Sequence, residues 1–267
     1  MDEVKKYTIK NYVVFGLVMK KTNIAKKCLD RILNVKIRDL KYIESEKTEK
    51  LAPDLHGIRM DVYCENDEAV YNIEMQAYTI DEIGKRSRYY QDVMDMAILG
   101  KGKPYSALKK NIVIFICTFD PFDKGRHIYT FENRCIQDHE LSLNDESLKI
   151  ILNTKGVMDD VPKSLRMFLD YIETDVVQDD YTKEIDEAVI EAQNNKRWRE
   201  RIMREEWLMQ DLVKAKEEAE NKEKTMKRET AIRMLNRGEF PDDTICEIAD
   251  ITFNELEEIK KNRKSVK

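Results

Sequence analysis

Two carboxylates and a side-chain amide lie close together in an alternating stretch of the chain and could hold a metal ion. Asp61 is followed thirteen positions later by Glu74, and Gln76 comes two residues after that. Apolar and polar residues alternate on both sides of a polar turn at 65–68, which predicts a β-hairpin over about 57–77. Alternate residues of a strand share a face, and carboxylate and amide oxygens are ligands that Mg²⁺ takes.

The register of this hairpin decides how close the two carboxylates come to each other. A turn centred at 66–67 predicts that Asp61 faces Asn72, with Glu74 as the diagonal neighbour of Asp61. Diagonal neighbours lie roughly 7 to 8 Å apart at the backbone, which lets both side chains reach one cation. A slip of two residues keeps the same faces, whereas a slip of one residue moves Glu74 away from Asp61.

The same register predicts an apolar face and a simpler role for Glu74. Met60 would face Ile73 on the side that packs inward. The other apolar residues on that side are Val62, Tyr71 and Met75. Arg59 would lie opposite Glu74, so an ordinary ion pair across a solvated sheet face remains an open alternative to a metal site.

Composition and charge limit the classes of protein to which the chain can belong. Its 267 residues are 42% hydrophobic, which suffices for a globular α/β domain and a smaller part. The 52 acidic and 47 basic residues give a net charge of -5, so contact with DNA has to be local. Five scattered cysteines without a C-x-x-C pair indicate a reducing compartment and no structural zinc site.

The sequence shows no signal for a membrane or for a nucleotide. The longest apolar runs, 12–19 and 112–117, are far shorter than the ~20 residues that cross a bilayer, and no cleavable signal pattern begins the chain. We therefore expect a cytoplasmic protein with no membrane partner. Neither common glycine-rich phosphate loop occurs, so no nucleotide cofactor is expected.

The segments around the hairpin predict a mixed sheet covered by helices. Apolar residues at helical spacing predict helices over 11–33 and 81–99, and the apolar run at 111–118 predicts a central strand buried on both faces. Shorter apolar stretches predict further strands at 35–42, 127–131 and 149–152. This order predicts an α/β fold, with the polar face of the hairpin at an opening.

The rest of the chain is predicted to be helical, because no glycine or proline occurs between Pro162 and Gly238. Residues 163–172 carry core-like positions and should pack on the sheet. Residues 184–228 have mixed charge and few apolar anchors, which is typical of a solvated long helix or a coiled coil. Such a charged helix could join two copies of the chain in a homodimer.

Two short helices are predicted within 231–260, after breaks at Gly238 and Pro241. Their spacing is that of a helix-turn-helix, but the second helix would begin with acidic residues that repel phosphate. These are Glu255, Glu257 and Glu258. A helical cap or an oligomerisation element is therefore favoured over a DNA reader. The chain divides in this interpretation into 1–175, 176–230 and 231–267.

A series of motifs in the first two-thirds of the chain resembles the PD-(D/E)XK nuclease family transposases, also described as recombination-promoting nucleases. The resemblance covers roughly residues 10–175 and includes the Asp-x(12)-Glu-x-Gln arrangement. The matching segments are 11–19, 44–47, 59–62, 71–76, 85–91, 115–122, 125–134 and 152–156. The resemblance implies a restriction-endonuclease-like fold and phosphodiester hydrolysis in DNA with the help of a divalent metal.

The resemblance also assigns roles to the hairpin residues. It implies that Asp61 and Glu74 hold Mg²⁺ or Mn²⁺, which would lower the pKa of bound water and stabilise charge on the scissile phosphate. Gln76 occupies the place of the lysine found in the wider superfamily. Glutamine can orient water or a phosphate oxygen by hydrogen bonding, but it brings no positive charge.

Four basic residues are candidates for contact with DNA. Arg59, Arg86 or Arg88 could supply the positive charge that Gln76 lacks, and Lys85 would join them in a basic rim around the carboxylates. Near the start of the predicted helix, Arg88 could clamp a phosphate through two hydrogen bonds, although a structural ion pair explains Arg88 equally well.

Other acidic residues are alternative candidates for the same site. Pro53 and Asp54 spell the proline and aspartate pair of the superfamily, but they fall in a loop before the strand, so Asp61 is favoured. Asp30 and Glu44 are the nearest candidates for an additional acidic ligand from the N-terminal part.

A second interpretation of the same residues is a non-catalytic module that keeps the nuclease scaffold and binds nucleic acid or protein. The lack of a net positive charge and Gln76 favour it. The two interpretations differ in their electrostatics, since a nuclease needs a basic rim around Asp61 and Glu74, whereas an acidic and closed surface there would count against cleavage.

Overall fold

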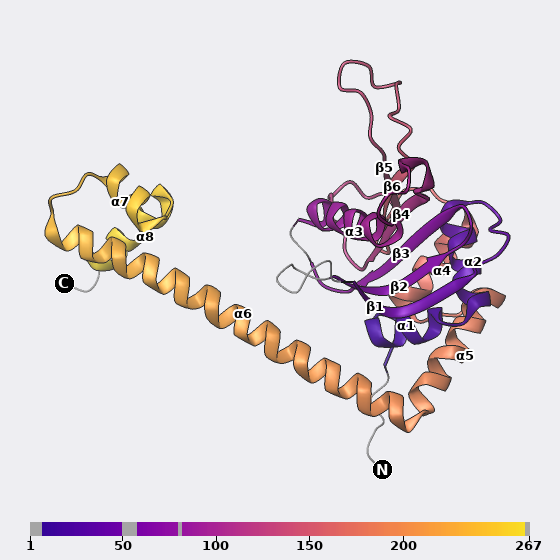
Figure 1. Ribbon diagram of the computed structural model, residues 1–267. Helices are drawn as coiled ribbons and strands as arrows, with labels where there is room; N and C mark the ends of the chain where they lie inside the picture. Colours follow the sequence, from indigo (N-terminus) through magenta and orange to yellow (C-terminus); the bar gives the residue numbers. More distant parts are fainter. Residues whose placement is uncertain (1–6, 50–57, 80–81, 265–267) are drawn as a thin grey trace, which may run out of the picture. The chain divides into compact units, whose positions relative to one another are not determined.

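The structure is a computed structural model that describes residues 7–49, 58–79 and 82–264 (Figure 1). The chain separates into two compact units, residues 1–202 and 203–267, which are described one at a time. The three-part division predicted from the sequence stays a prediction.

A six-stranded mixed sheet forms the centre of the first unit, with the strand order β1-β2-β3-β4-β6-β5. Strands β1, β2 and β3 are antiparallel neighbours, β3, β4 and β6 run parallel, and β5 is antiparallel to β6. The strands are β1 (Tyr42–Glu49), β2 (Ile58–Glu65), β3 (Ala69–Gln76), β4 (Lys110–Cys117), β5 (Ile128–Phe131) and β6 (Ser147–Asn153). The predicted mixed α/β sheet is confirmed.

Helices cover both faces of this sheet, because the central strand is apolar on both sides. Along β4, Ile112, Ile114 and Ile116 pack into one cluster, while Val113 and Phe115 pack into another. The first cluster lies under α1 (Tyr12–Met19), α2 (Thr22–Leu33), α4 (Lys163–Thr174) and α5 (Asp180–Asn194). The second lies under α3 (Ile83–Ile98), which crosses the other face (Figure 1). The predicted buried strand and the predicted helix at 81–99 are confirmed.

The N-terminal segment forms two helices, so the single helix predicted over 11–33 is wrong. The Asn11 side chain accepts hydrogen bonds from the amides of Val13 and Val14 and begins α1. Six of the eight α1 residues are buried, whereas α2 has one apolar stripe. The chain turns at Lys20 and Lys21 so that each helix packs on the core in its own way.

The first strand begins later than the sequence predicted. Residues 35–41 are irregular, although Ile37 and Leu40 are buried, and the amide of Ile37 donates to the Asp30 carboxylate at 2.6 Å. Strand β1 is instead a polar sequence that pairs with β2 at the edge of the sheet. Edge strands are often polar, and they give no apolar alternation by which to find them.

Helix α5 belongs to the core of the first unit, contrary to the prediction that the chain from 184 onward is a solvated helix. Ile185, Ala188 and Val189 are buried in the same cluster as the sheet and α4. The long helix α6 (Lys196–Arg237) follows, and Ile202 near its start is fully buried in that cluster.

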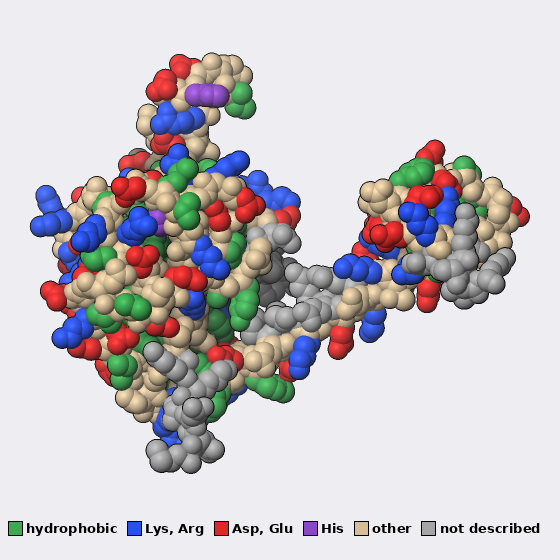
Figure 2. Space-filling model, turned by 180° about the vertical axis from the view of Figure 1, so that it is seen from behind, with side chains coloured by type: hydrophobic (Ala, Val, Ile, Leu, Met, Phe, Trp, Pro, Cys, Tyr) green, Lys and Arg blue, Asp and Glu red, His purple; other side chains and the backbone are tan. Residues whose placement is uncertain are grey.

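The second unit is a small helical cluster. Helix α6 ends at Arg237, and the chain then forms α7 (Asp242–Ala249) and α8 (Phe253–Lys264), as the breaks at Gly238 and Pro241 predicted. Its core consists of Ala231, Met234, Ile245, Ala249, Leu256 and Ile259. No helix among the described residues is long and apolar enough to cross a membrane. The face of the protein seen in Figure 2 mixes basic and acidic side chains, in keeping with the balanced composition.

Candidate active site on the β2–β3 hairpin

The β2–β3 hairpin brings Asp61 and Glu74 together more directly than predicted. The last regular pair of the ladder toward the site is Val62 with Ile73, so Asp61 lies next to Glu74 and not opposite Asn72. The predicted register is therefore wrong by two residues. Because the shift is even, both carboxylates keep the common face that the alternation predicted.

The turn chemistry explains this register. The side-chain oxygen of Asn66 accepts hydrogen bonds from the amides of Glu68 (2.9 Å) and Ala69 (2.7 Å), and the Asn66 amide donates to the Ala69 carbonyl. These bonds centre the turn on Asp67 and Glu68 and set the pairing of the two strands.

Beyond that pair the two carboxylates replace the regular ladder. The Asp61 amide donates to Oε1 of Glu74 at 3.0 Å, and the Met75 amide donates to Oδ2 of Asp61 at 2.9 Å. Each side chain thus satisfies a backbone amide of the other strand, so main-chain pairing between the strands stops where the carboxylates begin. This exchange of bonds fixes the positions of both carboxylates.

The side chains of β2 also change faces at this point. Val62 packs in the cluster under α1 and α2, but Met60 packs with Ile58 in the cluster under α3. The prediction that Met60 shares the inward face of Val62 and Ile73 is therefore wrong. With no ladder to β3 before Val62, the strand is free to twist there.

Helix α3 places an arginine against the same carboxylates. Arg86 Nη2 lies 3.2 Å from Oε2 of Glu74, and Arg86 Nη1 donates to the side-chain oxygen of Gln76 at 3.1 Å. Nη2 also donates to the hydroxyl of Tyr90, one helical turn later, at 2.9 Å. The guanidinium lies over the Phe115 ring of β4, with 5.5 Å to the ring centre. Arg86 therefore joins Glu74, Gln76 and the helix.

The three predicted hairpin residues are buried. The exposed fractions are 7% for Asp61, 1% for Glu74 and 9% for Gln76. Burial raises the pKa of Asp61, and the neighbouring Glu74 charge raises it further. Burial also raises the pKa of Glu74, while the Arg86 charge opposes that shift. Arg86 forms an ion pair with Glu74, and the charges of Arg59 and Arg86 also oppose the rise in the pKa of Asp61.

The chain also matches a model of a known protein family. The family model described as PD-(D/E)XK nuclease family transposase matches residues 13–239. The chain belongs to this family. No curated protein and no solved structure gave a match. The mixed sheet with helices on both faces is consistent with a restriction-endonuclease-like α/β fold, and the match continues through α6.

Within this PD-(D/E)XK family member, Asn72 is a further polar residue on the face of Glu74. Asn72 is fully buried two residues before Glu74 and opposite Tyr63. Its side-chain amide lies close enough to lower the pKa of Glu74. Neither its oxygen nor its nitrogen makes a hydrogen bond of standard length and angle with another described residue. A polar group left so in the interior has capacity for an additional partner.

The residues at the site fit a hard divalent cation by their donor chemistry. Asp61, Glu74 and Gln76 offer oxygen ligands, the two carboxylates lack balancing charge, and Asn72 has unused polar atoms. Among the described residues no three acidic, histidine or cysteine side chains cluster closely enough to form a metal cage. A cation would therefore depend on amide, main-chain or water oxygens for its other ligands, and it would compete with Arg86 for Glu74 and Gln76.

Of the four basic residues proposed for DNA contact, Arg86 hydrogen-bonds to a carboxylate of this nuclease-family site, and the charge of Arg59 also lowers the pKa of Asp61. Lys85 is exposed and pairs with Glu82, and Arg88 is exposed on α3. The Arg59 guanidinium lies 4.8 Å from the ring centre of Tyr12.

The other acidic residues proposed as ligands, Asp30 and Glu44, make contacts or pair elsewhere. Asp30 binds the Ile37 amide and pairs with Lys26 at 3.3 Å, and Glu44 lies opposite Tyr63 on β1. Pro53 and Asp54 lie outside the described residues.

Two residues of the site were missed by sequence analysis, namely Tyr90 and Asn72. Tyr90 shares a helical stripe with Arg86 and Ile83, at spacings of four and three residues, so the spacing offered a signal for it. Asn72 is the polar residue before Glu74 on the same face of β3; the predicted register placed it opposite Asp61, whereas it lies opposite Tyr63, and no role was predicted for it.

Proposed function

We propose that this chain is a divalent-metal-dependent DNA endonuclease that acts in recombination or in the movement of mobile elements. The observation that carries the proposal is the meeting of the Asp61 and Glu74 carboxylates at the point where the β2–β3 ladder stops, with Arg86 beside them. The family match supports a nuclease and a DNA substrate.

In this proposal each residue has a distinct task. Asp61 and Glu74 would hold Mg²⁺ or Mn²⁺, and a metal so placed lowers the pKa of bound water and stabilises charge on a phosphate. Gln76 would orient water or a phosphate oxygen through its amide. Arg86 supplies the positive charge that glutamine lacks, since a guanidinium can bind a phosphate through two hydrogen bonds.

Arg86 would exchange partners during this activity. In the structure it holds Glu74 and Gln76, and its side chain is 33% exposed. If the Glu74 oxygens held a cation, the Arg86 guanidinium would lose this partner and could turn toward a phosphate. Arg59, Lys85 and Arg88 would add charge at a wider radius around the bound DNA.

The long helix provides a surface for self-association in the same proposal. Met203, Trp207 and Leu208 are exposed on α6, among residues of mixed charge. A homodimer through this helix would carry two sites, which suits cleavage of two strands. We further propose that the protein works in the cytoplasm on DNA and needs no nucleotide cofactor.

A second candidate function is a binding module without catalysis. The burial of Glu74 and the hydrogen bonds of Arg86 to Glu74 and Gln76 favour it, because the guanidinium already occupies oxygens that a metal would need. In that case DNA or protein would bind with the same strength whether metal is present or not.

A nicking assay on supercoiled plasmid with Mg²⁺, Mn²⁺ or EDTA separates the two candidates. The variants Asp61→Asn and Glu74→Gln keep the shape of each side chain, and Asp92→Asn, an exposed position on α3, is the matched control. We expect nicking with metal by the wild type and the control, and none by the two site variants. A folded wild type that nicks with neither metal, yet binds DNA in EDTA, supports the binding module instead.

A further inference from the structure

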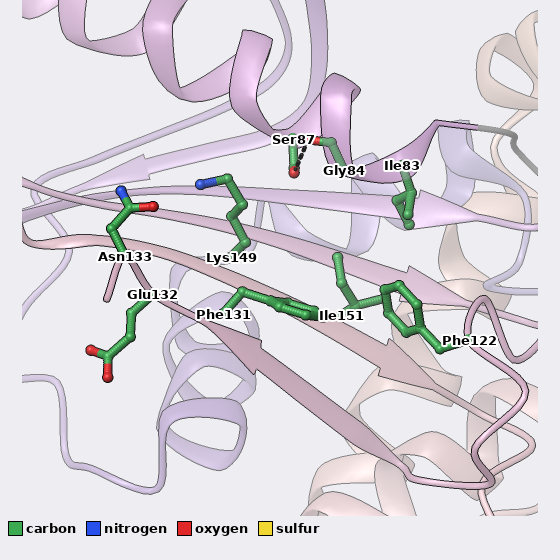
Figure 3. Close-up of a pocket in the computed structure, with 9 residues that line it drawn as sticks. All are labelled: Ile83, Gly84, Ser87, Phe122, Phe131, Glu132, Asn133, Lys149 and Ile151. Atoms are coloured by element: carbon green, nitrogen blue, oxygen red, sulfur yellow. Dashed lines mark hydrogen bonds between the residues drawn. The ribbon is translucent and has the colours of Figure 1, made fainter. Parts of the chain in front are cut away.

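A cavity lies between the start of α3 and the strands β5 and β6 (Figure 3). It has a volume of about 330 Å³ and opens between the first turns of α3, the loop after β4 and the strands β5 and β6. This volume is at the lower end of the range for small-molecule sites. Ser87 lines the cavity and is the neighbour of Arg86, so helix α3 contributes residues both to the cavity and to the candidate active site.

One end of the cavity is aromatic and apolar. Phe122, Phe131 and Ile151 gather there in Figure 3. The Phe122 and Phe131 rings lie 5.4 Å apart between centres, tilted by 56°, and Phe131 is 43% exposed although it lies in a strand. An exposed ring beside an apolar floor can receive a flat aromatic group such as a nucleobase.

The other end is polar and carries a positive charge. Lys149, Ser87 and Asn133 lie there (Figure 3). Lys149 stands between Val113 of β4 and Phe131 of β5, both apolar, and its side chain makes no ion pair or hydrogen bond with any residue in the described part of the chain. The Glu132 carboxylate points away from it and pairs with Arg134. The ammonium is therefore available to an anion.

We propose that this cavity binds one nucleotide of an unpaired DNA strand. The base would lie against Phe131 and Phe122, and its phosphate would meet Lys149. The proposal rests on the proposed function, because the strand would be that of the enzyme's own DNA substrate. Arg86 and Ser87 are consecutive on α3, so the same strand could reach the carboxylates from this cavity. A free mononucleotide has the same chemistry, and the experiment separates the two sources.

Binding of a short labelled single strand, followed by fluorescence anisotropy in EDTA, tests the cavity without cleavage or metal. We expect Phe131→Ala to weaken binding by about tenfold, the usual scale for loss of a stacking ring, and Phe131→Tyr to bind as the wild type. Lys149→Met should reduce the slope of log affinity against log salt by about 0.7. Tyr105→Ala and Lys101→Met, at exposed positions away from the cavity, are the matched controls.

The outcomes also separate this proposal from the nuclease itself. If Phe131→Ala and Lys149→Met bind the strand as strongly as the wild type, the proposed binding of a nucleotide in the cavity is wrong, even if plasmid nicking is intact. It is also wrong if the wild type binds no single strand. Loss of binding in both variants supports the cavity even if the wild type nicks no plasmid with any metal. Deoxyadenosine monophosphate that competes as strongly as the strand supports the cavity and makes the free nucleotide its occupant.

Discussion

Two carboxylate clusters in the first unit are each paired with an arginine, yet their electrostatics are opposite. At the start of α5, Asp179 accepts hydrogen bonds from the Thr182 amide at 2.8 Å and from Arg31 at 2.7 Å. Burial alone would raise its pKa, but these bonds outweigh burial and the pKa falls below its usual range. At the hairpin, burial dominates, and the pKa values of Asp61 and Glu74 rise.

The difference distinguishes a carboxylate that stabilises the folded state from carboxylates that destabilise it. Asp179 caps the N-terminus of a helix, where a negative charge is stabilising. Asp61 and Glu74 bring two charges into a buried place with insufficient compensation, which lowers the stability of the folded state. Such imbalances are found at functional sites, where a ligand completes the charge. The proposed cation would balance the charge of the hairpin cluster, whereas Asp179 already has its partners.

The largest contrast between the clusters is expected in DNA cleavage. Glu74→Gln should lower the metal-dependent nicking rate by about 10³-fold, the upper scale for loss of one electrostatic group at a reaction centre. Asp179→Ala should leave the rate per folded molecule unchanged, since it removes only the helix cap and the contact with Arg31. Plasmid nicking rates, normalised to the folded fraction from circular dichroism, measure both. Equal losses in the two variants would remove the distinction between the clusters.

Arg86 should give the next largest effect. Replacement by Met removes the only guanidinium that hydrogen-bonds to Glu74 within the described residues, and we expect about a 10²-fold loss of nicking. Arg86→Lys restores the charge without the two-pronged geometry and should recover part of that loss. Arg88→Met, two residues away and exposed, is the control. An Arg86→Met variant that nicks faster than the wild type would show that the guanidinium only blocks the metal.

Alternation and continuous apolar runs were sufficient to predict much of the scaffold. The run at 111–118 predicted β4, and the alternation around Asp61 and Glu74 predicted the hairpin and the shared face of its carboxylates. These signals succeed because burial on one or both faces constrains every second residue.

The remaining features depend on interactions that the pattern does not contain. A two-residue shift leaves the alternation unchanged, so only the hydrogen bonds of Asn66 could set the hairpin register. Strand β1 is polar and pairs at an edge, so no apolar pattern marks it. The sequence offered four basic residues near the site, and the packing of α3 on the sheet selected Arg86 among them.

Stability should change in opposite directions in the two clusters. Asp61→Asn can keep an oxygen for the Met75 amide while it removes one of two repelling charges, so the free energy of unfolding at pH 7 should rise by about 1 to 2 kcal/mol. Asp179→Ala should lower it by about 1 kcal/mol through loss of the cap. Urea unfolding of both variants in EDTA provides the measurement. A destabilised Asp61→Asn would show that the hairpin carboxylates already have enough compensation without a cation.

The smallest expected effect is the slope of stability against pH, and it also differs in sign. The unfolded Asp61 carboxyl ionises near pH 4, below its raised pKa in the folded state, so between these values the folded protein binds more protons. Stability from this cluster is present below pH 4 and is lost as pH rises through the folded pKa. Asp179 has a lowered pKa, so its contribution is present above pH 4 and is lost as pH falls through that lowered value. Urea unfolding of the wild type, Asp61→Asn and Asp179→Ala between pH 3 and 8 compares the slopes. Each ionising group contributes at most about 1.4 kcal/mol per pH unit, so Asp61→Asn should remove a fall and Asp179→Ala a rise of that order or less. An Asp61→Asn curve parallel to the wild type in EDTA would mean that the carboxylates titrate alike in the folded and unfolded chain, and the contrast between the two clusters would be lost.

Saturating Mg²⁺ should reverse the wild-type fall in stability above pH 4. A metal binds the ionised carboxylates of the folded state, and its affinity grows as they lose their protons.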